Sequence, residues 1–154
     1  MEATLTRHRF RAMGTDMELL VDADGAASAL AAAEAEFHRL EALLTRFRPE
    51  SELSRLNAAG RLAAGPDLLR VVELALSGRG RTGGRFDITI HDALLAAGYD
   101  RSFELLSLDD ARPARTVGSA PGRVEIADGV ISLHGGVRID VGGIGKGYAC
   151  ERAA

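Results

Sequence analysis

The sequence predicts an α+β fold with antiparallel strands and two main helices. Three observations carry this expectation: an alternating stretch near the N-terminus, two amphipathic stretches after it, and a second pair of strand signals towards the C-terminus. Because strands and helices come in separate runs, a regular alternation of β and α elements is not expected. A length of 154 residues, a hydrophobic content of 46% and a formal net charge of −3 are typical of one globular domain.

The first two strands are expected at residues 10–13 and 17–21, joined across residues 14–15. In the second strand apolar residues alternate with polar ones, which is the period of a strand with one buried face. A helix is expected at residues 26–48, because apolar side chains recur there at spacings of three and four and Pro49 ends the pattern. The apolar stripe of this helix consists of Leu30, Ala33, Phe37, Leu40, Leu44 and Phe47.

A second main helix is expected to begin at Pro66 and to stop at Gly83–Gly84. Before it, residues 51–57 carry serines that could cap a short helix, and residues 60–65 are interpreted as a loop. The inward side chains of the second helix are expected to be Leu68, Val72 and Leu76.

A β-prone run at residues 86–90 leads into a helical segment at residues 92–98. The polar stretch 99–122 receives no assignment. Residues 124–133 carry the signal of a hairpin around Asp128–Gly129, a dipeptide that favours a type I′ turn. A final strand is expected to follow this hairpin.

Composition argues against several classes of function. The charge balance gives no sign of nucleic acid as a partner, and no window approaches the ~18 apolar residues of a membrane span. The N-terminus lacks the apolar region of a signal peptide, so a cytoplasmic location is expected. Cys150 is the single cysteine and has no internal disulfide partner, and the four histidines lack zinc-ligand spacing.

The most informative stretch, residues 137–149, is interpreted as a strand that runs into a glycine loop and then a helix starting near Lys146. Glycines in the loop let a ligand approach the backbone, and the helix N-terminus and the Lys146 charge favour an anion. Asp140 is suited to accept hydrogen bonds from ring N–H or ribose hydroxyl groups. Neither the P-loop nor the dinucleotide fingerprint fits the spacing, and a tight turn without a ligand remains an alternative.

The Phe86–Asp87 pair resembles a ligand contact more than a core position, because a carboxylate there needs a partner. Three arginines, Arg79, Arg81 and Arg85, flank the preceding glycines. They could meet phosphate or form a solvated surface cluster.

Four ordered segments, residues 13–15, 46–57, 84–90 and 139–149, resemble the ApbE family of FAD:protein FMN transferases. The resemblance covers nearly the whole chain but only about the N-terminal half of a family member. It therefore implies that residues 1–154 are the N-terminal part of a single ApbE-like domain, related to the T-fold and incomplete at the C-terminus.

The resemblance also implies a reaction. The family transfers the FMN part of FAD to a Ser or Thr hydroxyl of an acceptor flavoprotein, using Mg²⁺ and releasing AMP. The residues it assigns to FAD are Met13, Phe47, Arg85, Phe86, Asp87, Asp140 and Lys146, and it assigns the carbonyl oxygen of Gly143 to the Mg²⁺. Asn57 and its neighbouring serines are expected to support the site.

The catalytic residues of the family are expected beyond residue 154, so this chain alone is expected to be inactive. One departure from the family lies within the chain, at His91–Asp92, where relatives carry Gly-Pro; these two residues are interpreted as structural. A non-catalytic FAD-binding module and a remnant of a broken gene are the alternative functions.

Overall fold

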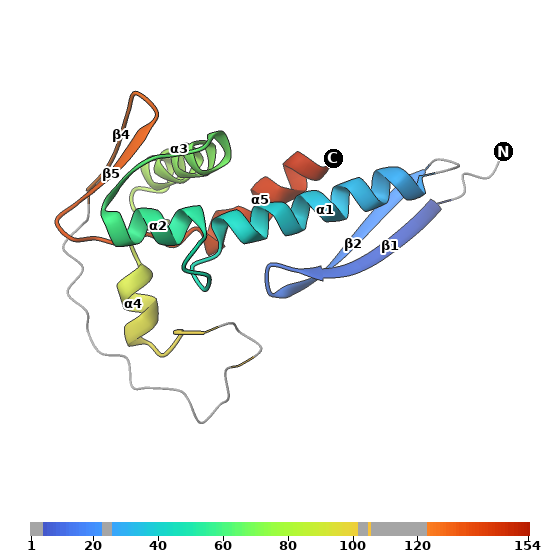
Figure 1. Cartoon of the computed structure of the whole chain (residues 1–154), viewed down its shortest axis with the longest axis horizontal. Helices are drawn as coiled ribbons and strands as arrows, with labels where there is room; N and C mark the ends of the chain where they lie inside the picture. The colour runs from blue at the N-terminus through green and yellow to red at the C-terminus, as the bar shows by residue number, and fades with distance from the viewer. Residues whose placement is uncertain (1–4, 23–25, 102–104, 106–122) are drawn as a thin grey trace.

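The computed structural model describes residues 5–22, 26–101, 105 and 123–154, and the α+β class is confirmed (Figure 1). The first hairpin lies beside the N-terminal part of the longest helix, and the second hairpin lies at the opposite end of the molecule. In chain order the elements are β1 (Leu5–Ala12), β2 (Thr15–Asp22), α1 (Ala27–Leu44), α2 (Glu52–Ala59), β3 (Arg61–Ala63), α3 (Pro66–Arg81), α4 (His91–Ala96), β4 (Arg123–Ala127), β5 (Val130–His134) and α5 (Gly142–Ala153).

The expected N-terminal hairpin is confirmed, with a turn one residue earlier than predicted. β1 and β2 pair antiparallel, and Met13 and Gly14 form the turn with φ of 52° and 68°. Positive φ at both positions gives a type I′ turn, which matches the twist of the flanking strands. Phe10 on the inner face packs edge-on against Phe37 of α1, with ring centroids 5.3 Å apart.

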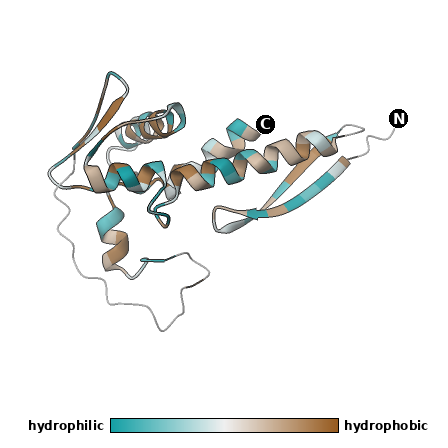
Figure 2. Cartoon of the chain, in the orientation of Figure 1, coloured by the Kyte–Doolittle hydropathy of each residue, from teal (hydrophilic) through white to brown (hydrophobic). Residues whose placement is uncertain are grey.

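The first main helix is confirmed, but it ends at Leu44 and not at residue 48. Thr45 takes an extended conformation (φ −71°, ψ 139°), so the chain leaves the helix before Pro49 is reached. Phe47 is therefore not part of the buried stripe, and 38% of its surface is exposed. Figure 2 shows hydrophobic and hydrophilic residues alternating along α1, whose buried members are Leu30, Phe37, Leu40 and Leu44.

Two predictions concern the segment after α1, of which one is confirmed and one is wrong. Ser51 caps α2, and its hydroxyl accepts a hydrogen bond from the Ser54 N–H at 3.0 Å. The loop expected at residues 60–65 instead contains β3, which pairs with β5. Gly60 ends α2 with a φ of 70°, and this left-handed turn brings the chain back alongside β5.

The second hairpin is confirmed, with Asp128 and Gly129 at φ of 50° and 74°. Together with β3 it forms an antiparallel sheet in the order β3-β5-β4. The strands expected at residues 86–90 and after the hairpin are wrong, because neither segment joins a sheet. Of the unassigned stretch 99–122, residues 102–104 and 106–122 lie outside the described residues.

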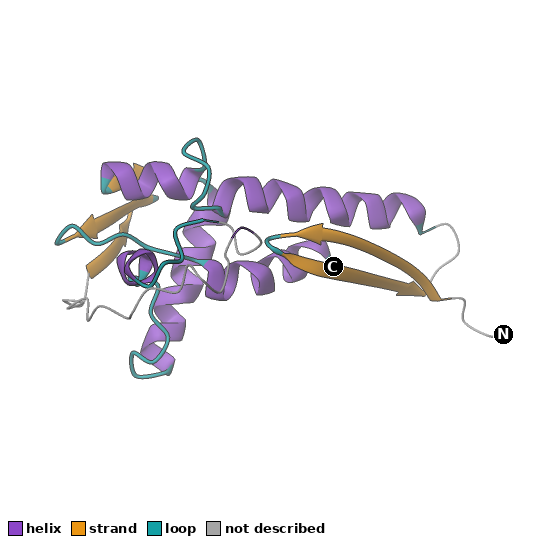
Figure 3. Ribbon diagram, turned by 90° about the horizontal axis from the view of Figure 1, so that it is seen from below, coloured by secondary structure: helices purple, strands orange, loops and turns teal. Residues whose placement is uncertain are grey.

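One core joins α1, α2, α3 and β5 to the segment before α5 and to α5 itself. α3 begins at Pro66, as predicted, and Figures 1 and 3 show that it lies across the direction of α1. Its buried residues include Leu68 and Val72 as expected, whereas Leu76 is only partly buried. Among the described residues, no helix is both long and apolar enough to cross a membrane.

Candidate functional site

A cleft of about 240 Å³ opens where the C-terminal end of α1, the turn of the first hairpin and the start of α5 meet. Four of the residues assigned to a ligand from the sequence line this cleft: Met13, Phe47, Asp140 and Lys146. The other lining residues are Gly14, Glu41, Leu44, Thr45, Arg46, Arg48, Tyr99, Val141, Gly142 and Gly145. The fold thus brings residues from the first hairpin and from the last helix to one site.

The hairpin turn at the rim of the cleft is held by α1. The backbone N–H of Met13 donates to Oε1 of Glu41 at 2.7 Å. A positive φ is uncommon for a residue other than glycine, so a partner that fixes Met13 in this conformation is needed. Glu41 was not singled out from the sequence, because a polar residue on a helix surface carries no signal of such a contact.

The predicted glycine loop before α5 is wrong: these glycines form the first turns of the helix. α5 begins at Gly142, well before Lys146. A helical glycine costs up to about 1 kcal/mol relative to alanine, and close packing explains Gly143 but not Gly145. A Cβ on Gly143 would lie 3.1 Å from the Phe86 ring, and one on Gly145 would lie 3.8 Å from Leu44.

Asp140 and Lys146 lie on either side of the α5 N-terminus. The Gly142 N–H donates to Oδ1 of Asp140 at 2.8 Å, so this carboxylate satisfies one donor of the first turn. Lys146, one turn further on, is the only lysine in a chain with 19 lysine and arginine residues. The partial positive charge of a helix N-terminus, together with this ammonium, favours an anionic ligand.

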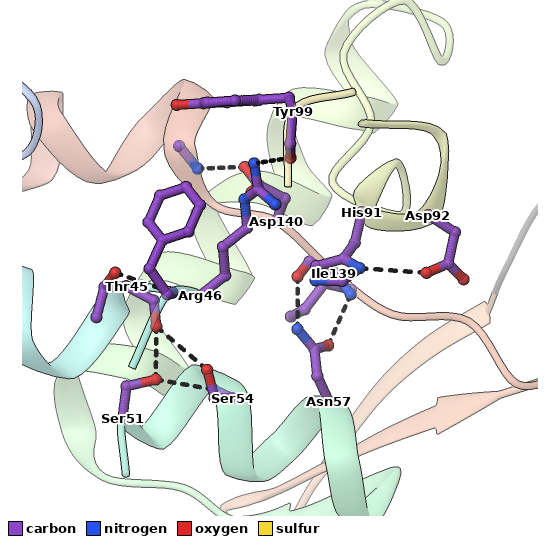
Figure 4. A network of polar contacts seen from close by, with 12 residues as sticks. Thr45, Arg46, Ser51, Ser54, Asn57, His91, Asp92, Tyr99, Ile139 and Asp140 are labelled. Carbon is purple, nitrogen blue, oxygen red and sulfur yellow. Dashed lines mark hydrogen bonds and ion pairs between the residues drawn. The ribbon is translucent and has the colours of Figure 1, made fainter. Parts of the chain in front are cut away.

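Arg46 organises the cleft, although the sequence did not distinguish it from neighbouring arginines (Figure 4). Its Nε lies 2.8 Å from Oδ2 of Asp140, and a terminal nitrogen donates to the Tyr99 carbonyl oxygen at 2.7 Å. The guanidinium carbon lies 4.4 Å from the centroids of both the Phe47 and Tyr99 rings. Only 5% of the Arg46 side chain and 11% of the Asp140 side chain are exposed.

Asn57 of α2 holds the irregular segment that carries Asp140. Its side-chain amide donates to the Ile139 carbonyl oxygen and accepts from the Ile139 N–H, both at 2.8 Å (Figure 4). One side chain thereby makes the pair of bonds that a neighbouring strand would make. A third bond, from the Asp140 N–H to the Ile88 carbonyl oxygen at 2.8 Å, fixes the other side of this segment.

α4 is fastened to the same segment through Asp92. Nδ1 of the buried His91 lies 3.2 Å from Oδ1 of Asp92, and Arg138 forms an ion pair with the same carboxylate. Burial acts to raise the pKa of Asp92, but the hydrogen bonds from His91 and Arg138 outweigh it and hold the pKa below its usual value. Both residues have structural contacts here, in line with their interpretation from the sequence.

Arg85, Phe86 and Asp87 do not line the cleft, and their assignment to a ligand remains a prediction. The Phe86 ring lies between α3 and α5, close to Gly78 and Gly143. Asp87 accepts hydrogen bonds from the backbone and hydroxyl of Thr89, and it lies 3.2 Å from Arg79. Arg85 is exposed. The contacts of Phe86 and Asp87 serve to connect α3 with the turn that follows it.

A polar network with Tyr148 and Asp67 buried anchors the helix that carries Lys146. The Tyr148 hydroxyl donates to Asp67 of α3 at 2.6 Å, and Arg39 of α1 lies 2.9 Å from the same carboxylate. Burial and this hydrogen bond raise the pKa of Tyr148 to about 12. Burial acts to raise the pKa of Asp67 too, but the hydrogen bonds from Tyr148 and Arg39 outweigh it and lower that pKa.

The described residues do not fit a magnesium site. They contain no group of three or more His, Cys, Asp or Glu side chains that could hold a metal ion. The carbonyl oxygen of Gly143, which was assigned to Mg²⁺, lies inside α5, where the helical ladder directs it towards the next turn. A single carbonyl oxygen is far from the six oxygen ligands that Mg²⁺ requires.

A profile of the ApbE family matches residues 13–154, whereas no curated protein sequence matches the chain. The structure resembles that of the ApbE protein from Thermotoga maritima, with a TM-score of 0.83 at 20% identity over 97% of this chain and 51% of that one. It also resembles the flavin transferase ApbE from Vibrio cholerae, with a TM-score of 0.74 at 18% identity over 98% and 52% of the two chains. A third similar structure is the apo form of the flavinyl transferase ApbE from Pseudomonas stutzeri, with a TM-score of 0.75 at 18% identity over 97% and 51%. The expected ApbE-like fold is confirmed, and the chain spans about half the length of these solved structures.

Proposed function

This chain belongs to the ApbE family, and we propose that its cleft binds FAD as part of a flavin transferase. The proposed reaction transfers the FMN moiety of FAD to a Ser or Thr hydroxyl of an acceptor flavoprotein, depends on Mg²⁺ and releases AMP. Because the chain spans about half the length of its solved relatives, the reaction is proposed for the whole protein and FAD binding for this chain. Residues 1–154 are proposed to be the N-terminal part of one ApbE-like domain.

The proposal is carried by the observation that Asp140 and Lys146 both line the cleft, near the N-terminus of α5. The helix N-terminus and the ammonium would attract the diphosphate of FAD, and the carboxylate would accept from ring or ribose donors. Met13, Phe47 and Tyr99 supply apolar wall for a planar ring. A cleft of about 240 Å³ is smaller than most ligand pockets, so it would hold part of the dinucleotide.

These residues would contribute to phosphoryl transfer by positioning and by electrostatic stabilisation. In such reactions the protein fixes the phosphate and neutralises its charge, and it holds the acceptor hydroxyl in line. Lys146 and the partial positive charge at the N-terminus of α5 would perform the first two tasks. Mg²⁺ is proposed for the whole protein only, because the described residues supply no ligand set for it and no step here depends on it.

Selective amine labelling tests FAD binding at this cleft. The chain has one lysine, so an amine-reactive reagent modifies only Lys146 and the N-terminal amine, which peptide mapping separates. Saturating FAD should slow the modification of Lys146 without changing that of the N-terminal amine, and riboflavin, which lacks phosphate, should protect less. Equal modification of Lys146 with and without FAD would contradict the proposed site.

The transfer itself is tested with the whole protein, FAD and an acceptor flavoprotein, by following covalent flavin fluorescence in a denaturing gel. An acceptor with its target Ser or Thr changed to Ala is the matched control, and removal of divalent cations should abolish the signal. FAD binding without labelled acceptor would favour the alternative of a non-catalytic FAD-binding module. No saturable FAD binding would favour the alternative of a remnant.

A further inference from the structure

We propose that Arg46 is a positioning residue of this cleft: it holds the Asp140 carboxylate and the Tyr99 wall where a flavin ligand would meet them. The inference rests on the proposed function and adds a residue that the sequence resemblance does not assign. Three segments that are far apart in the chain meet at its guanidinium: the linker after α1, the residues after α4, and the segment before α5.

The chemistry of this position requires arginine. The planar guanidinium donates in one plane to Asp140 and to the Tyr99 carbonyl oxygen, while the Phe47 and Tyr99 rings lie 4.4 Å from its central carbon. An ammonium is a compact, strongly hydrated charge and has no flat fork that could do both. Only 5% of the Arg46 side chain is exposed, and a buried charge needs hydrogen-bond or ion-pair partners, which these contacts provide.

Arg46 would act through Asp140. One oxygen of this carboxylate accepts from the Gly142 N–H and the other contacts Arg46, so the group is oriented from two sides. Each carboxylate oxygen can accept more than one hydrogen bond, so both retain capacity for a ligand donor. Without Arg46 the carboxylate would keep only the Gly142 contact, and it would be free to rotate out of its present orientation.

A double-mutant cycle in FAD binding tests this role. Arg46→Lys should weaken FAD binding by about tenfold or more, since a charge-assisted hydrogen bond and its geometry are lost. In an Asp140→Asn background the same substitution should cost less than about threefold, because the group through which Arg46 acts has already changed. Arg55→Lys on the exposed face of α2 is the matched control and should leave affinity unchanged.

Additive losses would mean that Arg46 contacts the ligand by itself or acts elsewhere, and would overturn the inference. A result in which the unsubstituted protein fails to bind FAD would instead overturn the proposed function. Additivity in a protein that does bind FAD leaves the proposed function intact, so the two failures are distinguishable.

A ligand-free measurement separates positioning from a loss of stability. The chain has two tyrosines and no tryptophan, so Tyr148→Phe leaves Tyr99 as the only tyrosine signal. In that background Arg46→Lys should change the near-ultraviolet circular dichroism of Tyr99 in the folded protein, and Arg55→Lys should not. An unchanged Tyr99 signal in a folded Arg46→Lys protein would also overturn the inference.

Discussion

Replacing Asn57 with alanine should remove a large share of the protein's stability. The side chain makes two 2.8 Å hydrogen bonds to the backbone of Ile139, a residue with 0% of its surface exposed. Because residues 137–141 do not join a sheet, no strand takes over these bonds when the amide is gone. A buried donor or acceptor left without a partner costs about 1–3 kcal/mol, so the loss should be about 2–6 kcal/mol against a typical total of about 5–15 kcal/mol.

Urea unfolding followed by circular dichroism measures this loss, with Arg55→Ala on the same helix as an exposed control. Asn57→Asp refines the test, because an ionised aspartate can accept from the Ile139 N–H but cannot donate to its carbonyl oxygen. Lowering the pH towards the aspartate pKa restores an O–H donor, so the deficit of Asn57→Asp relative to the unsubstituted protein should shrink on acidification. A loss below about 1 kcal/mol for Asn57→Ala would refute the idea that Asn57 substitutes for a strand.

Two further predictions concern α5. Gly143→Ala places a Cβ 3.1 Å from the Phe86 ring. It should be destabilising or neutral, because an overpacking cost of about 1–3 kcal/mol opposes a helix-propensity gain of up to about 1 kcal/mol. Gly147→Ala has open space around its Cβ and should stabilise the protein by about 0.5–1 kcal/mol. Equal melting temperatures for these two variants would contradict the packing argument. The pKa of Tyr148 is raised to about 12. The stability that its protonated hydroxyl contributes should therefore be complete below about pH 10 and lost as the pH rises through 12. Tyr148→Phe should flatten the dependence of stability on pH in that window. An unchanged profile would show that Tyr148 is not the titrating group.

Much of the fold followed from local patterns in the sequence. Asp128–Gly129 marked a hairpin because a type I′ turn requires positive φ at both positions, and the structure has that turn. Ser51 marked the start of α2 because a serine hydroxyl can satisfy a free N–H of the first turn, and it does so. Such signals are contained within a few residues, so a single sequence is enough to detect them.

The errors arose where a distant contact overrides local preference. Residues 86–90 and 137–141 have strand-like composition, yet only one backbone bond, between Ile88 and Asp140, joins them. Other backbone groups of the two segments bond to side chains, namely those of Asn57, Thr82 and Asp87. Gly142 and the glycines after it looked like a loop because glycine is a poor helix former. They are helical because α5 packs closely on Phe86 and Leu44, and no local pattern encodes those contacts.

The candidate site contains residues that a local sequence pattern identifies and a residue that only a distant contact identifies. Asp140 and Lys146 could be singled out because charges beside a glycine-rich segment favour an anion, and the structure brings both to the cleft. Arg46 could not, because Arg46 and Arg48 have the same local chemistry and only the turn after Leu44 decides which of them is buried against Asp140.

Each irregular wall of the cleft depends on a side chain from another part of the chain. Glu41 of α1 holds the Met13 turn, Asn57 of α2 holds the segment of Asp140, and Arg46 joins that segment to Tyr99. A wall outside a sheet or helix has few other hydrogen bonds to hold its position. When one of these bonds is lost, few remaining contacts keep the wall in place. Substitutions at these three holding residues should therefore perturb the cleft as strongly as substitutions at residues that line it for a ligand.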